Sequence, residues 1–177
     1  MRRFSLIRSL VLLPFLGVAP ALARPDAAKW PLTLRDGLPA TLTGWAAAPT
    51  DPLPEEDENA MGQYTEVGRF FQKIESSSST KQFRLSVQDY GAGRDLVSQL
   101  KNAFSEAASS GVETRSLEIG RFRAFVVTDR SAGKPTTIVT VIVSPSRLVL
   151  GQGANVAGDE AVALVRNVDL ARVAAAK

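Results

Sequence analysis

Polar and apolar residues alternate strictly over residues 82–88, which is the pattern of a half-buried strand. Phe83, Leu85 and Val87 fall on one face of this strand, and polar residues fall on the other. After a turn, apolar residues recur at helical spacing, at Leu96, Val97, Leu100, Ala103, Phe104 and Ala107. The stretch therefore predicts a strand that leads into an amphipathic helix, and both need further sheet to pack on.

Other segments have the apolar content and bounding turn residues of strands, namely 64–74, 112–119, 121–130, 136–143 and 147–150. The short polar run before residue 82 predicts that the first of them forms an antiparallel hairpin with the 82–88 strand. Within the 136–143 strand, residues 138–143 are the most apolar and lack alternation, so we expect this strand at the sheet centre with both faces covered. Gly151-Gln152-Gly153 leads out of the last strand. Beyond it, Asp159 is predicted to cap a closing helix and Asp169 a short final turn.

These elements predict one α+β domain over residues 63–177, in the order β-β-α-β-β-β-β-α. Short connections favour antiparallel neighbours, which gives an antiparallel sheet of about six strands packed by two helices. Over Tyr64–Ala176 this order resembles the Mog1/PsbP-like α/β/α sandwich, in which an antiparallel sheet lies between helices. The resemblance is one of architecture and implies no functional residue.

The first 23 residues have the pattern of a signal peptide. Arg2, Arg3 and Arg8 form a basic region, an apolar run over residues 10–19 follows, and Ala21-Leu22-Ala23 fits the small-x-small rule for cleavage. The apolar run is too short to span a membrane. We therefore expect export to the periplasm or the medium, with no stable membrane anchor after cleavage.

Residues 24–62 are proline-rich and are predicted to form an extended N-terminal arm. The leucines and tryptophans of residues 30–45 are too apolar for a free tail, so this part should lie on the domain with Trp45 as an anchor. The acidic run Glu55-Glu56-Asp57-Glu58 is predicted to be a solvated loop. A calcium or partner site is the alternative, although consecutive carboxylates lack the alternating spacing of a calcium loop.

The composition excludes several functions. The chain has no His and no Cys, so His-dependent or Cys-dependent nucleophile systems and ordinary zinc or haem sites cannot form, and we expect no metal or cofactor. Removing the three signal arginines from the 21 Lys+Arg leaves 18 basic residues against 18 acidic ones. A mature chain with zero formal net charge and no polybasic run is not expected to bind nucleic acid or an anionic membrane.

Five residues are candidates for ligand binding. Asp89 extends the inward side of the 82–88 alternation and lies beside Tyr90; capping of the next turn is the favoured interpretation, and a ligand carboxylate is the alternative. Arg69, Arg121 and Arg123 fall on predicted strands and, with Arg84, could form a basic sheet face for an anionic ligand. Pairing of such arginines with Glu66, Glu113 and Glu118 on a solvated face is the commoner outcome.

The sequence therefore predicts an exported, non-catalytic accessory domain that binds an envelope protein or a small ligand. Two alternatives remain open. One is a hydrolase that uses two carboxylates, Asp89 with one of Glu113, Glu118 or Asp129, which would have to lie about 5–10 Å apart in a cleft. The other is an inhibitor or structural module that acts through the proline-rich arm.

Overall fold

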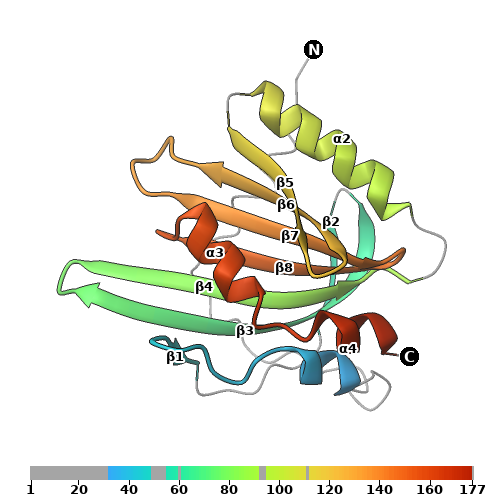
Figure 1. Ribbon diagram of the computed structural model, residues 1–177, viewed down its shortest axis with the longest axis horizontal. Helices are drawn as coiled ribbons and strands as arrows, with labels where there is room; N and C mark the ends of the chain where they lie inside the picture. The colour runs from blue at the N-terminus through green and yellow to red at the C-terminus, as the bar shows by residue number, and fades with distance from the viewer. Residues whose placement is uncertain (1–31, 49–54, 60, 92–94, 111, 177) are drawn as a thin grey trace.

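The computed structural model describes residues 32–48, 55–59, 61–91, 95–110 and 112–176, and the predicted signal peptide lies outside them. One antiparallel sheet of eight strands forms the centre of the molecule (Figure 1). Its strand order is β1-β3-β4-β8-β7-β6-β5, and β2 also pairs with β3. The predicted α+β class with an antiparallel sheet is confirmed.

The two strands that pair with the outer side of β3, β1 and β2, are short, and the other strands are longer. In chain order they are β1 (Ala46–Ala47), β2 (Glu55–Asn59), β3 (Gly62–Ser76), β4 (Ser79–Asp89), β5 (Glu113–Ile119), β6 (Phe122–Asp129), β7 (Thr136–Ser144) and β8 (Arg147–Ala154). As predicted, β3 and β4 form an antiparallel hairpin, with Phe71 opposite Phe83.

The predicted count of about six strands, and the order built on it, omit β1 and β2. Both short strands come from the segment that was expected to be an extended arm, and the acidic run is a strand and not a solvated loop. Acidic residues have low strand propensity, so nothing local marks β2. Its strand conformation comes from pairing with β3, where Glu56 lies opposite Thr65 and Glu58 opposite Gln63.

The centre of the sheet is β8 and not β7, which was expected there. Both faces of β7 are nevertheless buried, as its apolar sequence predicted. Gly151 and Gly153 lie within β8 instead of leading out of it. A Cβ on Gly151 would lie 2.4 Å from Val165 Cγ2 and 2.8 Å from Phe83 Cζ, so glycine is needed here for close packing.

Helices cover both faces of the sheet (Figure 1). On one face lies α2 (Leu96–Ser109), whose Phe104 ring is 4.9 Å from that of Phe125. On the other face α3 (Gly158–Val165) and α4 (Leu170–Ala175) close the larger core. Asp169 caps α4 as predicted, because its carboxylate accepts from the Arg172 N–H at 2.9 Å. The cap predicted at Asp159 is wrong: α3 is preceded by Ala157, and Asp159 lies in the first turn, where its carboxylate pairs with Arg115.

The described part of the N-terminal segment packs on the domain. A 3₁₀ helix, η2 (Leu32–Gly37), replaces the expected extended chain, and Leu34, Leu38 and Leu42 are buried in the core. Trp45 is half-buried with its ring 6.1 Å from that of Phe83. The expectation that the stretch up to Trp45 lies on the domain, with Trp45 as an anchor, is confirmed for its described part, residues 32–45.

Candidate functional site

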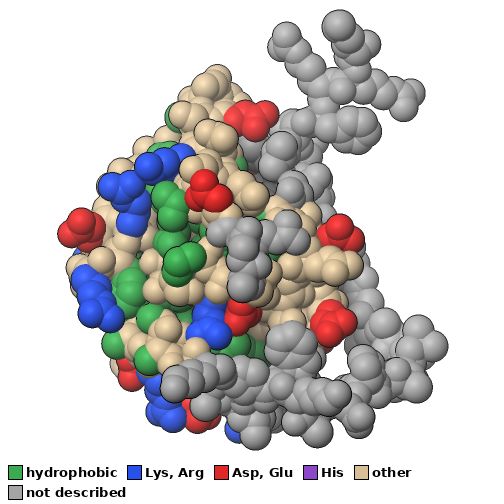
Figure 2. All heavy atoms as spheres, turned by 90° about the vertical axis from the view of Figure 1, so that its right-hand side faces the viewer, with side chains coloured by type: hydrophobic (Ala, Val, Ile, Leu, Met, Phe, Trp, Pro, Cys, Tyr) green, Lys and Arg blue, Asp and Glu red, His purple; other side chains and the backbone are tan. Residues whose placement is uncertain are grey.

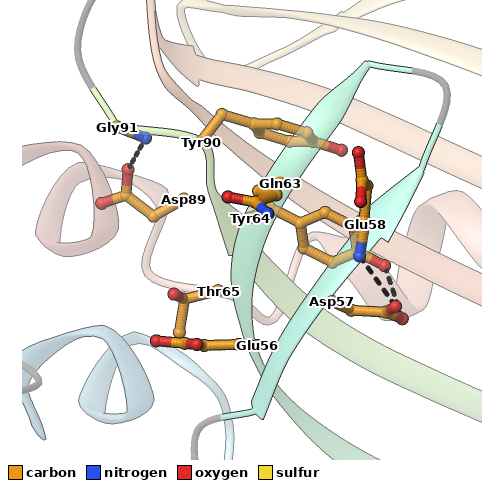
Figure 3. A pocket seen from close by; sticks show the side chains of 9 residues that line it. All are labelled: Glu56, Asp57, Glu58, Gln63, Tyr64, Thr65, Asp89, Tyr90 and Gly91. Carbon is orange, nitrogen blue, oxygen red and sulfur yellow. Dashed lines mark hydrogen bonds between the residues drawn. The ribbon is translucent and has the colours of Figure 1, made fainter.

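A hollow of about 480 Å³ lies where β2, β3 and β4 come together at one end of the sheet (Figure 3). This volume falls within the range of small-ligand sites. The residues that line it are Glu56, Asp57, Glu58, Gln63, Tyr64, Thr65, Asp89, Tyr90 and Gly91. The lining therefore includes four carboxylates and two tyrosines, and no Lys or Arg.

Strand register determines how these side chains are distributed. Glu56, Thr65 and Asp89 lie opposite one another across three strands and so project to the same face. Asp57 and Tyr64 form the neighbouring pair and project to the other face, on which Tyr90 also lies (Figure 3). The residues that line the hollow therefore come from both faces of β2 and of the neighbouring strands.

The two tyrosines are stacked and held by hydrogen bonds. Their ring centroids are 5.2 Å apart. The Tyr64 hydroxyl donates to Asp57 Oδ2 at 3.1 Å, and the Tyr90 hydroxyl donates to Gln88 Oε1 at 2.9 Å and accepts from Asn59 Nδ2 at 2.8 Å. Because both hydroxyls are anchored, the rings form a fixed aromatic wall beside the carboxylates.

Both phenols resist ionisation. Burial raises the pKa of Tyr90 to about 12, with the Glu66 and Asp57 carboxylates acting in the same direction and the Asn59 hydrogen bond opposing them. Burial, followed by the same two carboxylates, also raises the pKa of Tyr64 well above its ordinary value. At ordinary pH both tyrosines are therefore neutral, and their hydroxyls serve the internal hydrogen bonds with Asp57, Gln88 and Asn59.

This shift predicts an alkaline loss of stability. The tyrosines of the unfolded chain lose their protons near pH 10, whereas those of the folded chain keep them. The contribution of the two tyrosines to the stability of the fold is therefore complete below about pH 10. It should be lost as pH rises through the folded pKa of about 12. The chain has only two tyrosines, so phenolate absorbance reports on Tyr64 and Tyr90 alone. Half-ionisation near pH 10 while the protein is still folded would contradict the buried tyrosine pair.

A row of polar side chains continues from the tyrosines along the sheet. Glu66 accepts from Arg84 Nη2 at 2.7 Å and from Gln88 Nε2 at 3.3 Å, and Gln88 in turn accepts from Tyr90. The Arg84 guanidinium also lies 5.1 Å from the Phe70 ring centroid. The predicted pairing of strand arginines with acids holds for Arg84 and Glu66, but this pair is largely buried and not on a solvated face.

Asp89 caps the following turn, as the favoured interpretation predicted, because its Oδ1 accepts from the Gly91 N–H at 2.9 Å. Its Oδ2 is 2.6 Å from Arg147 Nε, an ion pair that no local sequence pattern indicates. Arg147 also donates to the carbonyls of Val173 and Ala176 at the end of α4. Asp89 therefore anchors the C-terminal helix to one wall of the hollow, and both its oxygens are occupied.

The predicted basic sheet face does not form. Arg69 is on β3 and Arg123 on β6, and three strands, β4, β8 and β7, lie between them. Arg69 also lies opposite the core residue Leu85, on the face that α3 and α4 cover. Arg121 is exposed, with its guanidinium 5.2 Å from the centroid of the Phe122 ring. The structure brings together Asp89 and Tyr90 of the five candidates and separates the three arginines from them.

The carboxylate pairs considered for hydrolysis are also far apart. Four strand spacings separate Asp89 on β4 from Glu113 and Glu118 on β5, or roughly 19 Å, about twice the largest productive separation. Asp129 is on β6, where it caps the next turn by accepting from the Ser131 N–H at 2.8 Å. Hydrogen bonds from Ser131 lower the pKa of the Asp129 carboxyl. A carboxyl held ionised in this way is a poor general acid.

Neither family models nor curated proteins nor solved structures give a match to this chain. The resemblance to the Mog1/PsbP-like sandwich therefore stays a prediction. Within the described residues, no group of three or more acidic side chains is arranged to hold a metal ion, and no helix is long and apolar enough to cross a membrane.

Proposed function

We propose that this protein is an exported, non-catalytic binding domain whose hollow at β2, β3 and β4 takes a positively charged ligand or partner. The observation that carries the proposal is the lining: four carboxylates and two stacked tyrosines without a lysine or arginine among them. Asp89 is neutralised by Arg147, which leaves Glu56, Asp57 and Glu58 as the charges available to a ligand.

The charges around the hollow favour a positively charged ligand. The ion pairs among the described residues do not include Glu56 or Glu58, and both side chains are exposed. Figure 2 turns the end of the molecule that bears β2 toward the viewer, and the charged side chains visible in its right-hand half are acidic. Carboxylates gathered in a concavity concentrate cations.

Calorimetric titration of the mature chain with arginine amide tests this function. We expect saturable binding that weakens as salt is added, because the attraction is between exposed charges. Glu56→Gln together with Glu58→Gln should weaken binding about tenfold, which corresponds to about 1.4 kcal/mol.

The matched control removes the same two charges from the opposite sheet edge, by Glu113→Gln with Glu118→Gln, and should bind as the unmodified chain does. Absence of saturable binding at low salt, or equal weakening by both double variants, would show that the hollow is not a cation site.

A further inference from the structure

The acidic strand β2 has one edge open. It pairs with β3 on one side, and within the described part of the chain no strand pairs with its other side. Glu55, Glu56, Asp57 and Glu58 are all exposed. An unpaired edge presents backbone N–H and C=O groups to any extended chain that comes beside it.

We infer that an extended, basic segment of a partner protein adds to the sheet as a further strand along β2. This inference rests on the proposed function and names its partner. Five residues of β2 offer about 17 Å of edge, enough for several main-chain hydrogen bonds. Strand addition supplies affinity through the backbone, and side-chain complementarity supplies selectivity.

The register defines the side-chain pattern of the partner. Alternate residues of an added strand would lie beside Glu56 and Glu58 on the face of Thr65 and Asp89, and the others beside Asp57 on the face of Tyr64. Carboxylates therefore meet the partner on both faces of the sheet. The preferred segment carries Lys or Arg on both faces, and the hollow gives room for one long side chain.

The same charges exclude a second copy of this chain. Two β2 edges placed side by side would bring four acids of one protomer against four of the other, and like charges opposite one another destabilise a strand pair. The other sheet edge, β5, differs because its acids have basic neighbours. Arg130 Nε lies 3.3 Å from Glu113, and Arg115 within β5 pairs with Asp159. The distribution of charge therefore favours β2 over β5 as the edge to which a basic strand adds.

The experiment compares two peptides on the full mature chain. One is a short strand-forming peptide in which arginine alternates with valine or threonine. The other has the same sequence with alternate backbone nitrogens methylated, so that it keeps its charge but loses the hydrogen bonds of one edge. Arginine amide is the third probe. Affinity is measured by calorimetry, and amide hydrogen exchange follows residues 55–59.

We expect the unmodified peptide to bind at least tenfold more tightly than the methylated one, and to slow amide exchange in β2. Equal affinities for the two peptides, or binding of arginine amide alone, would overturn strand addition while the cation site stands. If none of the three probes binds, the proposed function fails as well.

Discussion

Replacing Phe83 with alanine is expected to lower the free energy of unfolding by about 3–5 kcal/mol. Phe83 is only 1% exposed, and it packs between Trp45 of the N-terminal segment and the two glycines of β8. Removal of its ring leaves a cavity between Trp45 and the two glycines of β8. For a domain of ordinary stability, this is a large share of the total. Denaturant unfolding measures the loss directly.

The control for this prediction is Phe70→Ala on the neighbouring strand. Phe70 is 45% exposed, so its truncation should cost much less. In a Trp30→Phe background, emission from Trp45 should also shift to the red in Phe83→Ala, because the tryptophan loses its ring partner. Equal destabilisation by the two phenylalanine variants would contradict the packing described for β4.

Gly151→Val is expected to destabilise the protein by about 3 kcal/mol, the upper end of the usual cost of overpacking. Even a Cβ would lie 2.4 Å from Val165 Cγ2, and Val165 belongs to a helix, in which its side chain has essentially one rotamer. The helix must move away from the sheet to accommodate the new side chain. Thermal unfolding of the variant gives the measurement.

Gln152→Ala is the matched control, because Gln152 is the next residue of the same strand, is half-buried and projects to the opposite face. It should change stability by well under 1 kcal/mol. A Gly151→Val protein as stable as the Gln152→Ala protein would mean that α3 does not approach β8 as closely as described.

Periodicity predicted the long elements well, because their patterns reflect burial. The alternation around Phe83 corresponds to β4, and the stripe from Leu96 to Phe104 corresponds to α2. Strand β8 was predicted too short, since glycine usually weakens a strand. Here the absence of a side chain at Gly151 and Gly153 lets Phe83 and α3 pack closely against β8. Phe83 is far from these glycines in the sequence, so no local pattern indicates this packing.

The candidate site was predicted only in part. Asp89 was recognised as a cap from its place after Val87, but its ion pair with Arg147 joins residues 58 positions apart, which no local pattern contains. Tyr64 and Glu56 were missed because they line the hollow only through pairing between β2 and β3. The acidic run itself was the available signal. A run of consecutive charges is typical of a solvated loop, so the sequence alone does not indicate β2.

The central claim is that cations bind beside β2, and nuclear magnetic resonance of the aromatic rings tests it most directly. Tyr64 and Tyr90 are the only tyrosines, and both line the hollow. Titration with arginine amide or the basic peptide should shift both tyrosine ring signals along one saturable curve, while the indole signal of Trp45, which packs against Phe83, stays unchanged. Tyrosine signals that remain fixed at saturating ligand would contradict the account.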